Sequence, residues 1–289
     1  MEDLRNQPPA TFTPVAGSWL LKALGAIVIA AAACAWLALC LLYWQGNWQL
    51  LYHPSAAITR TPASAGIAFE PVKFAATETG TTQLTGWWLP SEGSRYTVVY
   101  LHGAEGNLSN TVDTLASLHQ QNLSIFVIDY RGYGQSLTAR PSEKQLRQDA
   151  EWALSWLTLT RNIPAKNILI AGSGLGANLA AELAADHSET AGLILDQPLQ
   201  DAMAPVLNDS RSRLVPASWM VHDRYDLTTA AARLRIPSLW LFDANTPKPP
   251  QAYTAVPAQQ SSAFLQNPAW KDPHFSETLK RWLDDLPSR

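Results

Sequence analysis

One stretch, residues 167–180 with the sequence NILIAGSGLGANLA, constrains the fold of this chain more than any other. Its first half is a short aliphatic and β-branched run, which is typical of a buried parallel strand. Its second half is rich in small, helix-forming residues. The chain must therefore turn sharply from a strand into a helix between Gly172 and Gly176.

This turn has the glycine spacing of the nucleophile elbow, G-x-S-x-G, in which a strained turn lifts a serine hydroxyl above the end of a sheet. Gly172 and Gly176 occupy the two glycine positions. Gly174 stands at the central position, where the serine belongs, and Ser173 comes one residue too early. The sequence predicts an elbow that has lost its nucleophile.

Composition limits the class of protein. With 289 residues, of which 47% are hydrophobic, the chain can bury one sizeable core, so we expect one α/β domain with appendages. The formal net charge of -3 lacks the basic excess that binding to nucleic acid requires, and no nucleic-acid partner is expected. Cys34 and Cys40 share one apolar segment, which indicates neither a disulfide framework nor a cysteine-based metal site. We expect no metal and no cofactor.

An uncharged apolar run at residues 23–44 predicts a membrane-spanning helix. At about 1.5 Å per residue the run extends about 33 Å, enough to cross the hydrocarbon core of a bilayer. Trp19 precedes the run, and Tyr43, Trp44 and Trp48 lie at its end. Aromatic residues in these places are typical of the belts that mark the two membrane interfaces.

Two other interpretations of the run are a helix buried in the core and a cleaved signal peptide. The length, the aromatic flanks and the lack of a clear small-x-small cleavage site favour an uncleaved anchor. Arg5 and Lys22 precede the run, whereas Arg60 is the first basic residue after it. The positive-inside rule then places the N-terminus in the cytoplasm. The expected location is the inner membrane of a bacterium, with the C-terminal domain in the periplasm.

The chain is expected to have three parts: a flexible tail at residues 1–17, a transmembrane anchor at 18–47 and a folded domain at 48–289 that starts with a linker through Pro54 and Pro62. Strands are expected at residues 68–76, 83–90, 97–103, 124–130, 191–196, 238–243 and 262–266, besides the strand of the elbow. Helices are expected at 107–122, at 142–160 with Ser142 as cap, after the elbow, within 198–235, and from Pro273 onward. This alternation predicts an α/β fold with a mostly parallel central sheet and helices on both faces.

Several blocks with a specific order follow the predicted strands. Residues 102–107 read HGAEGN, residues 129–136 read DYRGYGQS and residues 172–177 read GSGLGA, with LILDQP at 193–198 and DRYDL at 223–227. Together they resemble the α/β-hydrolase superfamily, and within it the membrane-anchored serine hydrolases whose blocks read HGNAGN, DYRGYGxS and GxSLGG. The resemblance covers about residues 48–286 and implies the α/β-hydrolase fold.

The resemblance also implies where a triad of serine, acid and histidine would lie. The nucleophile position is Gly174, which has no side chain. The acid position is Thr246, which carries no charge, and the histidine position is Gln266, which takes no proton. With all three positions substituted, no catalytic residue is expected.

Four residues are fallback candidates for a rearranged site, namely Ser173, Asp196, Asp243 and His274. Ser173 would act only if the elbow were shifted by one residue. The two aspartates are better explained as capping or solvated residues that follow strands. His274 is better explained as the first residue of the last helix.

The same resemblance places an oxyanion hole at the backbone N–H groups of Ala104 and Leu175. His102, Gly103 and Glu105 are expected to line the pocket beside these groups. A carboxylate at Glu105 would oppose a developing oxyanion rather than stabilise it.

These features favour a membrane-tethered pseudoenzyme that serves as a binding or assembly partner, so the membrane and a protein are the expected partners. Two alternatives stay open. One is an active serine hydrolase, such as an esterase, lipase or peptidase, with a rearranged site. The other is a sensor that holds a small acyl or ester-like ligand in the old pocket.

Overall fold

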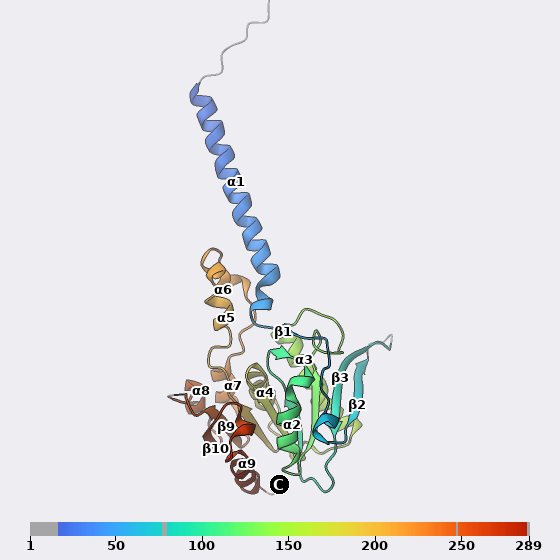
Figure 1. Cartoon of the computed structure of the whole chain (residues 1–289). Helices are drawn as coiled ribbons and strands as arrows, with labels where there is room; N and C mark the ends of the chain where they lie inside the picture. The colour runs from blue at the N-terminus through green and yellow to red at the C-terminus, as the bar shows by residue number, and fades with distance from the viewer. Residues whose placement is uncertain (1–16, 77–79, 247, 288–289) are drawn as a thin grey trace, which may run out of the picture.

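The computed structural model describes residues 17–76, 80–246 and 248–287. A long apolar helix projects from a folded domain in which helices cover a central sheet (Figure 1). The helices are α1 (Gly17–Gly46), α2 (Val112–His119), α3 (Glu143–Ser155), α4 (Leu175–Asp186), α5 (Ala204–Leu207), α6 (Ala217–Met220), α7 (Leu227–Arg233), α8 (Gln251–Thr254) and α9 (Phe275–Asp284). The strands are β1 (His53–Pro54), β2 (Glu70–Ala76), β3 (Thr82–Leu89), β4 (Thr97–Leu101), β5 (Glu105–Gly106), β6 (Ser124–Asp129), β7 (Ile168–Ser173), β8 (Gly192–Asp196), β9 (Ser238–Asp243) and β10 (Gln260–Leu265).

Within the described ranges, eight strands form one sheet in the order β10-β9-β8-β7-β4-β6-β3-β2. The strands from β10 to β6 run parallel, whereas β3 is antiparallel to both β6 and β2. Every residue of β4 and β6 is buried, because helices cover both faces, and this explains why their sequences are almost continuously apolar. The expected α/β-hydrolase fold with a mostly parallel sheet is confirmed.

The sheet separates two apolar layers. On one face, α3 and α4 pack through residues such as Leu146 and Leu179. On the other face, α2 and α9 pack through residues such as Leu115 and Leu279. Alternate side chains of each inner strand point into the two layers, and the carboxyl ends of the parallel strands are left to carry the loops of the candidate site.

The segment at residues 198–235 differs from the helical stretch expected there, because it holds three short α-helices, α5, α6 and α7, and one 3-10 helix, η6 (Ser210–Arg213). Pro205 lies in the first turn of α5, and Pro216 is the N-cap residue of α6. Proline has no N–H group to donate, so it starts helices but does not continue them. We call residues 203–221 the cap segment.

The start of α3 also differs in detail from the prediction. Ser142 is the N-cap residue, but its side chain makes no capping hydrogen bond. The N–H of Glu143 instead donates to the carboxylate of Asp223 at 3.1 Å. The carboxylate of Asp223, from a distant part of the chain, therefore accepts a hydrogen bond at the start of α3, where the Ser142 side chain was expected to act as the cap.

Helix α1 is long and apolar enough to cross a membrane. Residues 1–16 of the expected tail lie outside the described residues. The expected linker through Pro54 and Pro62 is ordered, because the short 3-10 helix η1 (Asn47–Leu50) follows α1 directly and Pro54 lies in β1, which pairs with β5. Pro62 begins a second 3-10 helix, η2 (Pro62–Ala65).

Three hydrogen bonds fasten α1 to the folded domain. The Trp36 indole N–H donates to the carbonyl oxygen of Leu214 at 3.0 Å, and the Tyr43 hydroxyl donates to that of Val206 at 3.1 Å. From the domain, Arg140 donates to the carbonyl oxygen of Trp44 at 3.0 Å. Tyr43 is buried against the cap segment, so its ring contacts protein at this end of the helix.

Candidate functional site

The strand–turn–helix of the elbow is formed as the sequence predicts. Strand β7 ends at Ser173 and α4 begins at Leu175, so Gly174 alone makes the turn. Its backbone has φ 55° and ψ −121°, a conformation that residues with side chains rarely adopt. The Gly174 N–H donates to the carbonyl oxygen of Asp196 at 2.9 Å, which holds the turn against β8.

The three glycines of the elbow have different reasons to be glycine. A Cβ atom on Gly172 would lie 2.2 Å from the carbonyl oxygen of Gly176. A Cβ atom on Gly176 would lie 2.2 Å from the carbonyl oxygen of Leu101. At Gly174 no atom lies within 4 Å of the added carbon, so only the backbone conformation favours glycine there. The elbow keeps its tight packing and leaves open space where a nucleophile would stand.

A cavity of about 640 Å³ opens beside the elbow. It is lined by the elbow residues, by the loop after β4, by α2, by the chain after α1 and by the start of the cap segment. Among its lining residues are the expected pocket residues His102, Gly103, Ala104, Glu105, Ser173, Gly174 and Leu175. The cavity is large enough for a small organic ligand.

The loop after β4 is held in place by two buried tyrosines. The Tyr133 hydroxyl donates to the carbonyl oxygen of Ala104 at 2.9 Å, and the Tyr130 hydroxyl donates to that of His102 at 3.0 Å. Both tyrosines belong to the DYRGYG block, so this block supports the loop rather than entering the cavity. The N–H of His53 also donates to Ala104, at 2.9 Å.

A buried histidine and a buried acid lie beneath this loop. The Nδ1 atom of His102 donates to the carbonyl oxygen of Gly103 at 2.8 Å, and its Nε2 atom lies 3.8 Å from Asp129. Burial lowers the pKa of His102 to about 4 and raises the pKa of Asp129 to about 7. His102 is therefore neutral at physiological pH, with its Nε2 lone pair facing the acid. Asp129 also accepts from the N–H of Leu108 at 3.0 Å, which ties the loop to β6.

The charges at the cavity are acidic. Glu105 and Asp201 are exposed at its wall, and no lysine or arginine is among the described residues that line it. Leu175 is the first residue of α4, so its N–H has no acceptor within the helix and can serve an anion. An oxyanion formed there would nevertheless face carboxylates, which raises its energy.

His53 is a cavity residue that the sequence analysis missed. Strand β1 pairs with β5 so that His53 stands opposite Glu105. No local pattern marks His53, because the contact depends on a two-residue strand pairing with a distant segment.

Ser173 lies at the floor of the cavity and not at the turn. It is the last residue of β7 and pairs with Asp196 of β8. Its hydroxyl and that of Thr114 lie near the hydroxyl of Tyr100. Tyr100 and Thr114 also line the cavity. The sequence did not mark either residue, because each lies inside a regular element, β4 or α2, and reaches the cavity only through the packing of these elements.

Of the other fallback candidates, Asp196 is the cross-strand partner of Ser173, whereas Asp243 and His274 lie on other strands and loops. The Asp196 carboxyl group is buried, and burial raises its pKa to about 6. Asp243 accepts hydrogen bonds from the backbone and side chain of Asn245. His274 is exposed at the N-cap of α9. None of these three is among the described residues that line the 640 Å³ cavity.

The two remaining positions of the expected triad follow neighbouring strands. Thr246 comes after β9, donates its N–H to the carbonyl oxygen of Asp243 at 2.8 Å, and lines a smaller cavity of about 290 Å³. Gln266 directly follows β10 and donates its N–H to Asp272 at 2.8 Å. Gly174, Thr246 and Gln266 thus all lie at the carboxyl edge of the sheet, each directly or shortly after a strand.

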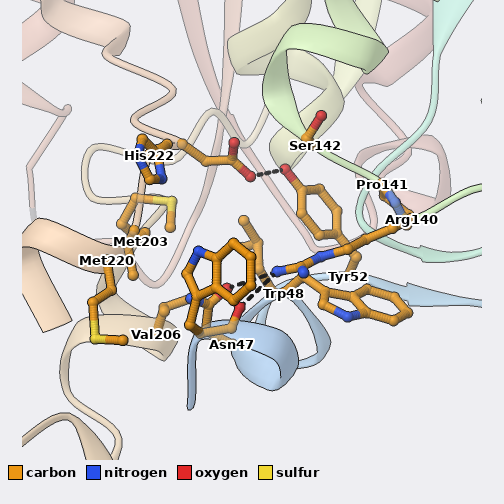
Figure 2. Close-up of a pocket in the computed structure, with 14 residues that line it drawn as sticks. Asn47, Trp48, Tyr52, Arg140, Pro141, Ser142, Met203, Val206, Met220 and His222 are labelled. Atoms are coloured by element: carbon orange, nitrogen blue, oxygen red, sulfur yellow. Dashed lines mark hydrogen bonds between the residues drawn. The ribbon is translucent and has the colours of Figure 1, made fainter. Parts of the chain in front are cut away.

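A second cavity, of about 430 Å³, lies where α1 meets the domain. Figure 2 shows Met203 and Met220 on one side of it and Arg140 and Ser142 on the other. Leu51 lines both this cavity and the one at the elbow, so the two adjoin. No local pattern predicts this cavity, because its walls come from segments far apart in the chain.

Comparison with known proteins agrees with this architecture. An uncharacterized protein of Mycobacterium tuberculosis is 34% identical over 162 residues, which cover 54% of each chain. The alpha/beta hydrolase domain-containing protein 17C of Xenopus tropicalis is 35% identical over 122 residues, which cover 42% of this chain and 39% of that protein. The chain thus spans about half the length of the curated relatives it matches, or less.

Solved structures show the same fold. The esterase Pf2001 of Pyrococcus furiosus superposes with a TM-score of 0.62 at 16% identity, over 81% of this chain and 99% of that one. An alpha-beta hydrolase from Vibrio vulnificus gives a TM-score of 0.58 at 22% identity, over 77% of this chain and 81% of that one. The family model described as serine aminopeptidase, S33, matches residues 92–268, which is more than half of the chain. The protein therefore belongs to the serine aminopeptidase S33 family and has the α/β-hydrolase fold.

Proposed function

We propose that this chain is a membrane-anchored α/β-hydrolase-fold protein that does not hydrolyse substrates and acts as a binding or assembly partner. One observation carries the proposal: Gly174 makes the turn of an otherwise intact elbow, with open space and no side chain where the nucleophile would stand. Removing one member of a triad typically lowers the rate by about 10⁴ or more.

The surroundings of the elbow support the same proposal. The acid and histidine positions of the family hold Thr246 and Gln266, which supply neither a charge nor a base. Glu105 and Asp201 stand at the cavity wall, where a developing oxyanion would need positive or hydrogen-bond-donating groups. Three substitutions on separate loops of one site fit the loss of a whole mechanism better than a change of one residue.

A rearranged serine hydrolase, the alternative, has little support. Ser173 lies near Tyr100 at the cavity, and the histidines among the described residues that line it are His102 and His53. His102 already donates to Gly103 through Nδ1 and turns Nε2 toward Asp129. His274, the proposed fallback base, is exposed on another loop. A serine without a base at hydrogen-bond distance is a weak nucleophile.

The cavity itself favours a second role, the binding of a small ligand without turnover. Its 640 Å³ volume suits a small acyl or ester-like compound. The charged side chains among its described lining residues are the acids Glu105 and Asp201, which repel an anion. A neutral ligand is therefore favoured over a free carboxylate. Such binding would let the protein report a ligand to a partner.

The proposal is tested by labelling the full chain in detergent with a broad fluorophosphonate probe. We expect no covalent adduct and no turnover of p-nitrophenyl esters above the buffer background, because no activated serine stands at the elbow. Peptide mass spectrometry after labelling gives the decisive readout. A stoichiometric adduct on Ser173 would overturn the proposal and establish the rearranged hydrolase.

A reconstruction tests where the lost triad stood. The single change Gly174→Ser should restore no useful ester hydrolysis, whereas Gly174→Ser combined with Thr246→Asp and Gln266→His should give measurable turnover, because only the combination supplies nucleophile, acid and base. Gly174→Ala in the same combined background is the matched control and should be inactive. Robust hydrolysis by the single variant would contradict the assignment of the three positions.

A further inference from the structure

The cap segment lies beside the helix that is expected to enter the membrane. Leu214 accepts a hydrogen bond from Trp36, and Val206 accepts one from Tyr43. Leu39 and Cys40 are partly buried against the domain, whereas residues 24–38 of α1 are exposed. Protein therefore contacts α1 from about Trp36 onward, and Figure 1 shows α5 and α6 next to the lower end of α1.

The tip of the cap segment carries charge. Arg211 pairs with Asp209 at 2.7 Å, and both Arg211 and Arg213 are exposed. Charged groups are strongly disfavoured in the hydrocarbon core of a bilayer but suit the layer of phosphate headgroups. The hydrocarbon core must therefore end before it reaches this tip, at about the level of Trp36.

The rest of α1 is still long enough to cross the core. From Gly17 to Trp36 the helix rises about 30 Å, which is the usual thickness of the hydrocarbon layer. Trp19 and Trp36 then lie near the two interfaces, where tryptophan is enriched. Lys22 can extend its long side chain to the nearer interface.

We propose that the cap segment rests in the lipid headgroup layer of the bilayer that holds α1, and that the hydrocarbon core ends at Trp36 rather than at Trp44. Trp219 is 84% exposed and Leu214 60% exposed, so both present apolar surface to this layer. Arg211 and Arg213 meet the phosphates of an anionic membrane surface. The inference rests on the proposed membrane anchor, and it places the folded domain directly against the membrane.

The position of the boundary is tested by cysteine reactivity in nanodiscs, where reagents reach both faces. In a full-length Cys34→Ala, Cys40→Ala background, single cysteines are placed by Ile29→Cys, Leu42→Cys and Leu159→Cys, at sites that are 72%, 66% and 78% exposed. A charged maleimide is the probe. Because a thiolate does not form in hydrocarbon, Ile29→Cys should react at least about tenfold more slowly than Leu159→Cys.

The outcome at residue 42 decides the proposal. Reaction of Leu42→Cys at a rate near that of Leu159→Cys supports a boundary at Trp36. Protection of Leu42→Cys as complete as that of Ile29→Cys overturns it, because the core would then extend to Trp44. Rapid reaction of Ile29→Cys would show that α1 does not span the bilayer at all, which removes the membrane anchor together with this inference.

Fluorescence quenching tests the cap segment directly. In the same background, a nitrobenzoxadiazole label is placed at Trp219→Cys or Leu159→Cys, in vesicles that contain anionic phospholipid and a nitroxide on the headgroup or in mid-chain. The label at residue 219 should be quenched by the headgroup nitroxide more than by the mid-chain one, and the label at 159 by neither. No quenching at 219, while a label at Ile29→Cys is quenched by the mid-chain nitroxide, would overturn the inference and leave the anchor intact.

Discussion

Replacement of Gly176 by alanine is expected to lower the free energy of unfolding by about 3 kcal/mol or more, or to prevent folding. The added Cβ atom would lie 2.2 Å from the carbonyl oxygen of Leu101 and 2.3 Å from that of His102. Both are backbone atoms at the end of β4, so no side chain can rotate away to make room. Relief would require α4 to move off the centre of the sheet.

Gly174→Ala is the matched control, because no atom lies within 4 Å of its added Cβ. Its cost should be about 1–2 kcal/mol, which is the strain of placing a side chain at φ 55°. Gly66→Ala, at φ 74° and also in open space, should cost a similar amount. Urea unfolding of the full chain in detergent, followed by near-UV circular dichroism, measures all three. Equal losses at residues 174 and 176 would contradict the packing argument.

A strong pH dependence of stability is the second large effect that we expect. Burial raises the pKa of Asp129 from its ordinary 3.8 to about 7. Below about pH 4 the carboxyl is protonated in both states and costs nothing. Between about pH 4 and 7 it ionises in the unfolded chain first, so stability falls as the pH rises, and above about pH 7 the loss is complete. A tenfold change in ionisation constant is worth about 1.4 kcal/mol, so the loss from this group is roughly 4 kcal/mol.

Asp129→Asn isolates this contribution, because asparagine has the shape of the protonated acid but does not titrate. The variant should resemble the parent near pH 4 and exceed it in stability near pH 8. Other buried carboxyls with raised pKa, such as Asp149 and Asp196, add slopes of the same sign, but these are common to both proteins and cancel in the difference. Urea unfolding at several pH values gives that difference. A difference that does not change with pH would show that Asp129 ionises normally in the folded state.

Most of the fold could be predicted because local sequence and burial agree. Strands β4, β6 and β7 are almost continuously apolar, which is what burial on two faces favours, and each is followed by a helical segment. The elbow was recognisable because steric contacts leave only glycine at residues 172 and 176. The last helix was also predictable, since Phe275, Leu279 and Trp282 recur with helical spacing and are buried on one side.

The contacts that build the two cavities could not be predicted in this way. His53 reaches the elbow through a two-residue strand, and Tyr100 and Thr114 meet Ser173 only because β4, β7 and α2 pack together. Asp223 caps α3 in place of Ser142 for the same reason. Such contacts join segments that are far apart in the chain, and no local pattern encodes which of them will meet.

Helix α1 was predicted as a length of apolar sequence but not as an element that contacts the domain. Periodicity and hydropathy describe how a helix meets its surroundings on average. They do not say that Tyr43 turns inward or that Trp36 bonds to Leu214, because those contacts depend on the path of the cap segment.

The bond from Arg140 to the last turn of α1 has a mechanical consequence. Its guanidinium group donates to the carbonyl oxygen of Trp44 and the side chain of Asn47, at the negative end of the helix dipole. Helix η1 follows α1 without an intervening loop, and this bond fastens the junction between the helix and the domain. The two should tumble as one body, so that any molecule met by lateral diffusion encounters the same face of the domain each time. Recognition by such a protein would depend on how far the partner's binding surface lies from the membrane and on its orientation, as much as on affinity.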